Sequence, residues 1–190
     1  LPGVYGVVTG ADVAGAINPI PSAVRVPIKF YPIAVEKVRY VGEPVAVIAA
    51  IDRYVAEDAM ELIEIEYESL PPVADPVAAL QDDAALLHDD VGSNEVHHRT
   101  FRYGDPDAAF ARADKVVKLE WRYPRYSSTP METYGVVANF ERQPDRYTIW
   151  SNFQGPFILH ALMTGALGVP GNRLRLITAP HSGGSFGIKQ

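Results

Sequence analysis

The run Ser151-Asn152-Phe153-Gln154-Gly155-Pro156-Phe157 opens the stretch that decides the fold, and the loop His181-Ser182-Gly183-Gly184-Ser185-Phe186-Gly187-Ile188-Lys189 closes it. Between them, residues 158–167 carry apolar side chains at helical spacing, and residues 174–178 form a β-like run. This order predicts a strand, a helix and a second strand, followed by a glycine-rich loop.

Gln154 lies at the predicted helix entrance. Pro156 suits the first turn of a helix, and Gly168 suits the position just past its end. Gln154 is therefore expected beside free N–H groups and the positive end of the helix dipole. We expect the strand–helix–strand path to bring Gln154 and Phe186 together at one edge of a sheet.

The glycine-rich loop suits an anionic ligand, because successive N–H groups in such a turn form a partly positive concavity. Lys189 adds a positive charge nearby. The loop is not a P-loop, since Ile188 separates Gly187 from the lysine, and it lacks the dinucleotide pattern G-x-G-x-x-G. An ordinary strand-to-strand turn is the alternative that glycine content alone leaves open.

Several motifs agree at fixed spacings: Asn152-Phe153-Gln154, Leu167 to Pro170, Asn172-Arg173 and Gly183 to Lys189. Together they resemble the molybdenum hydroxylases, a family that includes xanthine dehydrogenase, aldehyde oxidase and the large subunit of aerobic carbon monoxide dehydrogenase. Residues 38–50 and 63–75 resemble the family's α/β hammerhead domain, and residues 129–140 resemble its Met-Glu-Pro segment, with Thr133 in place of the usual Pro.

The resemblance implies an α+β fold in which a hammerhead domain precedes the first part of a molybdopterin-binding domain. We expect an N-terminally incomplete hammerhead domain over residues 1–80, a linker over residues 81–95 and the first part of the cofactor domain over residues 96–190. The linker prediction also follows from the Pro, Asp and Gly content of residues 70–93.

The resemblance also implies a set of site residues. Gln154 would donate a side-chain hydrogen bond to a molybdenum oxygen, the backbone at Phe186-Gly187 would support another oxo group, and Gly184 with Ser185 would contact the pterin phosphate region. Gln154 and Phe186 would thus reach the metal only through its oxygens. Gln190 falls where xanthine dehydrogenases have a substrate-facing Glu. The predicted cofactor-binding residues are Gln154, Gly183, Gly184, Ser185, Phe186 and Gly187.

The implied activity is hydroxylation or oxidation of an aldehyde, an N-heterocycle, an acyl-CoA or carbon monoxide with oxygen derived from water. The family's catalytic Glu belongs to a downstream segment, so no catalytic residue is expected here and the chain alone should be inactive. The pterin form, with or without an added nucleotide, is left open. Expected partners are the remainder of the molybdopterin subunit, an iron–sulfur subunit, an FAD subunit and a small-molecule substrate. The alternatives are a metal-free assembly or binding module and a phosphate-binding protein that uses the glycine loop alone.

Composition excludes several other classes of protein. The chain has 190 residues, a net charge of −6 and no cysteine. The acidic balance lacks the basic footprint of a nucleic-acid binder, and no run of 18 apolar residues predicts a membrane span. Without cysteine, these residues cannot hold a [2Fe–2S] cluster, so such carriers are expected on partner chains or domains. We expect a cytoplasmic location.

The rest of the chain alternates short strand and helix patterns. Asp52 is a plausible N-cap for a helix over residues 54–63, and Asp105 opens a second helix over residues 105–113. Residues 134–140 and 147–150 predict a hairpin around 143–145. Further strands are predicted over residues 4–8, 38–40, 44–50, 64–68, 96–103 and 116–123.

Glu132 is the carboxylate that invites assignment as a general base. It lies in the polar, turn-rich segment 123–132. Because buried carboxylates are usually paired, we instead predict that Glu132 anchors a loop through hydrogen bonds.

Overall fold

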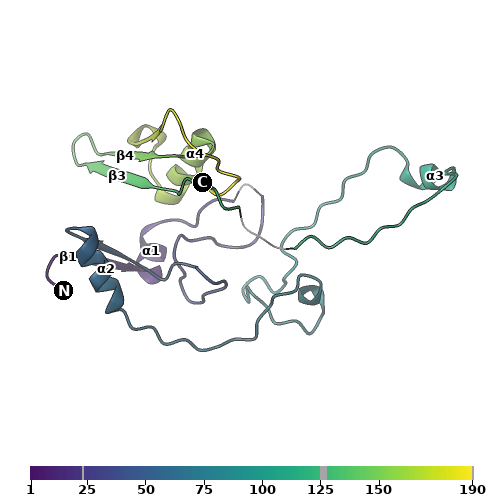
Figure 1. Ribbon diagram of the computed structural model, residues 1–190, viewed down its shortest axis with the longest axis horizontal. Coiled ribbons are helices and arrows are strands. Elements are labelled where there is room, and N and C mark those ends of the chain that lie inside the picture. The colour runs from purple at the N-terminus through teal and green to yellow at the C-terminus, as the bar shows by residue number, and fades with distance from the viewer. Residues whose placement is uncertain (23, 125–127, 190) are drawn as a thin grey trace.

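A computed structural model describes residues 1–22, 24–124 and 128–189 (Figure 1). The N-terminal unit contains β1 (Val4–Thr9), α1 (Gly10–Ala16), β2 (Ala46–Ala50) and α2 (Arg53–Glu61). A middle region holds η1 (Ala78–Leu80) and α3 (Pro106–Ala111). The C-terminal unit contains β3 (Val136–Glu141), β4 (Arg146–Ser151), α4 (Pro156–Leu167), η2 (Gly171–Arg173) and β5 (Leu174–Thr178). No helix among the described residues is long and apolar enough to cross a lipid bilayer.

The N-terminal unit is a two-stranded antiparallel ribbon with a helix after each strand. β1 pairs with β2, and the register runs from Val4 opposite Ala50 to Thr9 opposite Ala46. The predicted N-cap of α2 is confirmed, because the Asp52 side chain accepts a hydrogen bond of 2.9 Å from the Val55 amide. The start of α1 packs so closely that a Cβ on Gly10 would lie 1.9 Å from the Ala34 carbonyl oxygen.

The C-terminal unit confirms the predicted strand–helix–strand path. β3 and β4 form the expected hairpin, and β5 joins β4 in parallel, so the order in the sheet is β3-β4-β5. Parallel neighbours need a long crossover, and α4 supplies it. Pro156 lies in the first turn of α4, and Gly168 ends it with a φ of 64°. Residues of β4, β5 and the β4–α4 turn form its core, which is Ile149, Phe153 and Leu174.

Asn18 links the two units. The Asn18 backbone N–H donates to the Ala166 carbonyl at 2.8 Å, and the Asn18 side-chain amide donates to the Gly165 carbonyl at 3.0 Å. The last carbonyls of a helix have no partners within the helix. A residue of the N-terminal unit therefore satisfies the C-terminal end of α4.

Several predicted strands are wrong. Residues 38–40, 64–68, 96–103 and 116–123 belong to no strand. A strand requires a hydrogen-bonded neighbour, and these segments have none among the described residues. Figure 1 shows residues 96–123 projecting from the body as a long loop with α3 at its tip. The second predicted helix is confirmed in that tip, capped by the Asp105 side chain, which accepts from the Ala108 amide at 3.0 Å.

Candidate functional site

Gln154 and the glycine-rich loop meet at the mouth of α4, as the sequence predicts. The Gln154 backbone N–H donates to the Lys189 carbonyl at 2.7 Å. Its side-chain Oε1 accepts from the Gly187 amide at 2.9 Å and from the Ser185 hydroxyl at 2.5 Å. The loop is therefore attached to the entrance of α4 through both the backbone and the side chain of one residue.

These contacts fix the orientation of the Gln154 side-chain amide. The Gly187 N–H is only a donor, so the group that faces it must be the carbonyl oxygen of the side chain. The Nε2 group then points the other way with two hydrogens. Within the described ranges, no residue accepts a hydrogen bond from it. Gln154 thus presents an oriented, neutral donor.

The loop bends sharply at Phe186 and Gly187. The Ile188 amide donates to the Ser185 carbonyl at 3.1 Å, and the two residues between them have φ values of 49° and 91°. Positive φ at both central positions is the sign pattern of a type I′ turn, which glycine adopts freely and phenylalanine does not. The Phe186 carbonyl also accepts from the Ser128 hydroxyl at 2.9 Å. This outside contact helps to hold Phe186 in its strained conformation.

The same bend leaves a row of amides available. Gly183 and Gly187 donate their N–H groups to side-chain oxygens, and Ile188 donates to a carbonyl. The N–H groups between them, on Gly184, Ser185 and Phe186, have no hydrogen-bond partner in the part of the chain that the structure describes. Three consecutive amides of this kind, in the loop that Gln154 holds, are donors suited to anionic oxygens.

Glu132 anchors the loop from a different part of the chain, which confirms its predicted structural role. One oxygen, Oε2, accepts from the Gly183 amide at 2.7 Å, from the Asn152 side-chain amide at 2.9 Å and from the Lys189 ammonium. The hydrogen bond from Lys189 is the main cause that lowers the pKa of Glu132 to about 2, with Asn152 and Gly183 contributing next. A carboxylate held in this way is a poor proton acceptor at neutral pH, which argues against a general base.

Lys189 corrects one expectation. Its charge was expected to help an anionic ligand, but its side chain is only 1% exposed and its ammonium pairs with Glu132. The carboxylate neutralises the lysine, so the cation serves the anchor rather than the concavity. No spacing rule predicts this pairing, because Glu132 and Lys189 are 57 residues apart. The contribution of Ser128 was missed for the same reason.

Two further points concern metal ligands at this site and the predicted substrate-facing residue. The described residues contain no group of three or more His, Cys, Asp or Glu side chains that could hold a metal ion. The site therefore provides hydrogen-bond donors rather than metal ligands. Gln190, the residue expected to face a substrate, lies outside the described residues.

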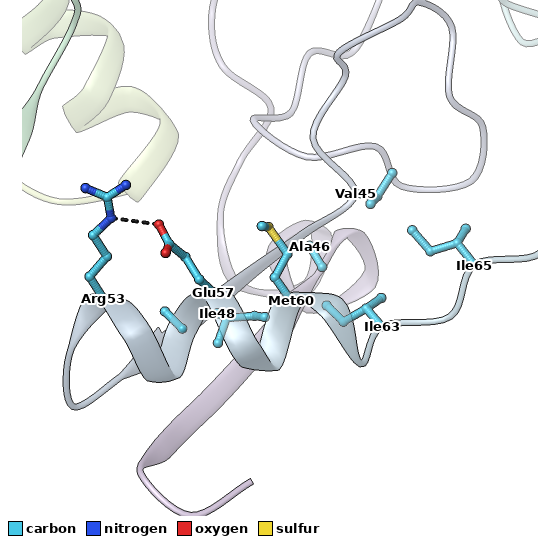
Figure 2. Close-up of a pocket in the computed structure, with 9 residues that line it drawn as sticks. Val45, Ala46, Ile48, Arg53, Glu57, Met60, Ile63 and Ile65 are labelled. Atoms are coloured by element: carbon cyan, nitrogen blue, oxygen red, sulfur yellow. Dashed lines mark hydrogen bonds and ion pairs between the residues drawn. The ribbon is translucent and has the colours of Figure 1, made fainter.

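An apolar groove elsewhere is not part of this site. It lies between β2 and α2, has a volume of about 340 Å³ and is flanked by the exposed ion pair between Arg53 and Glu57 (Figure 2). Its other lining residues are aliphatic or Met, namely Val45, Ala46, Ile48, Ala56, Met60, Ile63 and Ile65. Without polar groups that converge on one point, it resembles a packing surface.

Known families match both units. Residues 1–71 match the aldehyde oxidase and xanthine dehydrogenase a/b hammerhead domain, and residues 87–190 match the molybdopterin cofactor-binding domain. The chain belongs to the molybdenum hydroxylase family. The predicted fold class, a hammerhead domain followed by molybdopterin-binding sequence, is thereby confirmed.

Relatives of this molybdenum hydroxylase chain are named for different substrates. It is 36% identical to the carbon monoxide dehydrogenase large chain of Afipia carboxidovorans, over 100% of this chain and 25% of the relative. It is 33% identical to the nicotine 6-hydroxylase large subunit of Paenarthrobacter nicotinovorans, over 100% of this chain and 23% of the relative. The structure of quinoline 2-oxidoreductase from Pseudomonas putida 86 matches with a TM-score of 0.85 and 34% identity, over 100% of this chain and 24% of that one.

The molybdenum hydroxylase chain therefore spans about a quarter of the length of these relatives. Those relatives are named as large chains or subunits, which places the family's large polypeptides in multisubunit complexes. The match over residues 87–190 contains both Gln154 and the glycine-rich loop.

Proposed function

We propose that Gln154 and the loop from Gly183 to Gly187 hold the molybdopterin cofactor of an oxidoreductase. The observation that carries the proposal is the orientation of Gln154: its Oε1 accepts from Gly187, so its Nε2 hydrogens are left to donate to a ligand. Three amides of the same loop, on Gly184, Ser185 and Phe186, have no partners among the described residues. Donors without acceptors fit a group rich in anionic oxygens.

Each residue has a separate role in this proposal. The Gln154 Nε2 donates to an oxygen on the cofactor, and the backbone at Phe186-Gly187 supports a second oxygen. Gly184 and Ser185 donate amide hydrogen bonds to the pterin phosphate region. Gly183 acts mainly through its bond to Glu132, which sets the shape of the loop. Because all these donors are neutral, the protein orients the cofactor without adding a formal charge beside it.

When bound, the molybdenum centre supplies the redox chemistry, taking two electrons from a substrate that gains oxygen from water. The substrate is an aldehyde, an N-heterocycle, an acyl-CoA or carbon monoxide. Relatives named for carbon monoxide, nicotine and quinoline match at 36%, 33% and 34% identity, so identity favours none of these classes. The catalytic Glu is proposed to lie on sequence beyond these residues, and the isolated chain is proposed to be inactive.

The proposed working unit is a complex. It contains the remainder of the molybdopterin subunit, an iron–sulfur subunit and an FAD subunit, and the pterin is present with or without an added nucleotide. Within it, residues 1–80 form the hammerhead domain, residues 81–95 the linker and residues 96–190 the first part of the cofactor domain. We place this complex in the cytoplasm.

Metal and pterin analysis of the natively purified complex tests the proposal. Stoichiometric molybdenum with an equal amount of pterin is the expected result. A complex that contains neither would favour a non-catalytic assembly module with the same fold. Stabilisation of the metal-free complex by nucleotides would instead favour a phosphate-binding function for the glycine loop.

A further inference from the structure

The projecting loop seen in Figure 1 carries a two-faced segment, which we call the return leg (residues 114–122). Along it, Val117, Leu119 and Trp121 alternate with charged residues, as in a half-buried strand. These apolar side chains are 79%, 84% and 77% exposed. A row of large apolar groups in solvent, all on one face of an extended segment, marks an interaction surface.

The backbone of the return leg also lacks hydrogen-bond partners among the described residues. Its residues make no backbone–backbone hydrogen bond with any described residue. The outgoing leg, residues 96–104, makes none either, so the two legs do not pair with each other within the described ranges. An extended segment with free N–H and C=O groups is a template for another strand.

The base of the return leg is nevertheless attached to the body. The Arg122 guanidinium pairs with the Asp75 carboxylate, and that carboxylate also accepts from the Val77 and Ala78 amides at 2.8 and 3.0 Å. Arg122 belongs to the charged face of the leg. The protein therefore contacts the charged face at this point and leaves the apolar face uncovered.

This chain exposes much more surface than a compact protein of the same mass, which indicates a large interface. A compact protein of 20.8 kDa exposes roughly 9,000 Å². This chain exposes 15,554 Å², or about 1.7 times as much. The excess is about 6,600 Å² on this chain alone, which is larger than a transient contact buries and at least as large as permanent interfaces.

A solved relative supports one kind of partner, which is more of the same polypeptide. The quinoline 2-oxidoreductase structure matches the whole of this chain, legs included, with a TM-score of 0.85, although that chain is about four times as long. The fold of this chain, aligned over its whole length, is therefore found within a polypeptide that has a large additional body. A second copy of this chain is a weaker candidate, because the match lies within one long polypeptide.

We propose that the return leg is a strand whose apolar face packs into the remainder of the molybdopterin subunit and whose backbone pairs with a strand of it. This inference rests on the proposed function, since that subunit is its proposed partner. The partner segment is expected to be a strand with its own apolar face, and the charged face formed by Lys118, Glu120 and Arg122 remains toward solvent.

Site-specific photo-crosslinking in the assembled complex tests the inference. A benzophenone amino acid is placed at Leu119 on the apolar face, and in a matched variant at Lys118 on the charged face. After illumination, peptide mass spectrometry identifies the crosslinked sequence. We expect Leu119 to crosslink to the remaining molybdopterin-subunit sequence at least about 10-fold more than Lys118, because side chains of neighbouring residues in a strand point to opposite faces.

Hydrogen exchange of the same complex gives a second measurement that does not depend on the cofactor. We expect the amides of residues 116–122 to exchange at least about 100-fold more slowly than an unstructured peptide of that sequence. Unprotected amides would overturn the proposal, as would crosslinks from Leu119 to a second copy of this chain, to an iron–sulfur or FAD subunit, or to nothing. Molybdenum content, measured on the same sample, reports separately on the proposed function.

Discussion

The Gln154 Oε1 accepts the Gly187 N–H at 2.9 Å, and this single contact determines which end of the side-chain amide faces a ligand. The oxygen is used inside the protein, and the nitrogen is left for an outside group. The shape of the loop and the direction of the donor are therefore set together, before any ligand is present.

Gln154→Glu separates these two tasks. A carboxylate still accepts from Gly187 and Ser185, but it has no hydrogens to donate and it adds a negative charge toward an anionic cofactor. We expect the complex to assemble and its turnover to fall by about 100-fold or more, as for loss of an oriented donor. Turnover and molybdenum content are measured together. Gln81→Glu, the same chemical change on an exposed side chain, is the control. Wild-type turnover and metal content in Gln154→Glu would contradict the role of the donor.

Glu132→Gln should weaken the loop more than the double change Glu132→Gln with Lys189→Met. The single substitution leaves a 1%-exposed ammonium without a counter-charge, whereas the double substitution removes that ammonium as well. Molybdenum retention after gel filtration and the unfolding temperature of the complex measure both variants. Lys189→Met alone is measured in the same way. If the effects of Glu132→Gln and Lys189→Met add up to the effect of the double change, Glu132 and Lys189 do not act as a pair.

Protonation of Glu132 should release the loop only well below neutral pH. The pKa of Glu132 is lowered from 4.5 to about 2, so its stabilising effect is fully present above pH 4.5 and is lost as the pH falls toward 2. The unfolding temperature of the wild-type complex should exceed that of Glu132→Gln by a constant amount above pH 4.5. The difference should narrow below that pH. A difference that grew on acidification would show the opposite linkage.

The start of α1 offers a matched pair of glycines for a stability test. Gly10→Ala places a methyl group 1.9 Å from the Ala34 carbonyl, whereas Gly15→Ala on the same helix meets nothing within 4 Å. Overpacking of this kind costs about 1–3 kcal/mol or more, while a helical Gly→Ala change gains up to about 1 kcal/mol. Thermal unfolding of the complex should therefore shift down for the first variant and stay level or rise for the second. Equal shifts would mean that the close contact at Gly10 relaxes without cost.

Local chemistry explains which elements could be predicted from the sequence. The caps Asp52 and Asp105 and the limits of α4 at Pro156 and Gly168 depend on residues within one helical turn, and the structure confirms each of them. The approach of Gln154 to Phe186-Gly187 also followed, because a strand–helix–strand path fixes which ends meet at one edge. The roles of these residues toward a cofactor stay a prediction.

The wrong strand predictions and the missed ion pair have a common cause, because each depends on a second segment that is distant in the sequence. Alternation along residues 116–122 reports correctly that one face is apolar, but it contains no information about which segment supplies the neighbouring strand. The Glu132–Lys189 pair is invisible for a similar reason, since only folding brings those positions together. A sequence pattern shows that a segment has an apolar face to bury, but it does not show which other segment covers that face.

The two hydrogen bonds from Asn18 to the last carbonyls of α4 make the two matched domains interdependent. A chimera that joins the first seventy or so residues of a distant relative to this cofactor domain would inherit whatever side chain that relative carries at the Asn18 position. Without an amide there, the helix that begins beside Gln154 would fray at its far end. We therefore expect the pair of domains to be exchanged more safely than either domain alone.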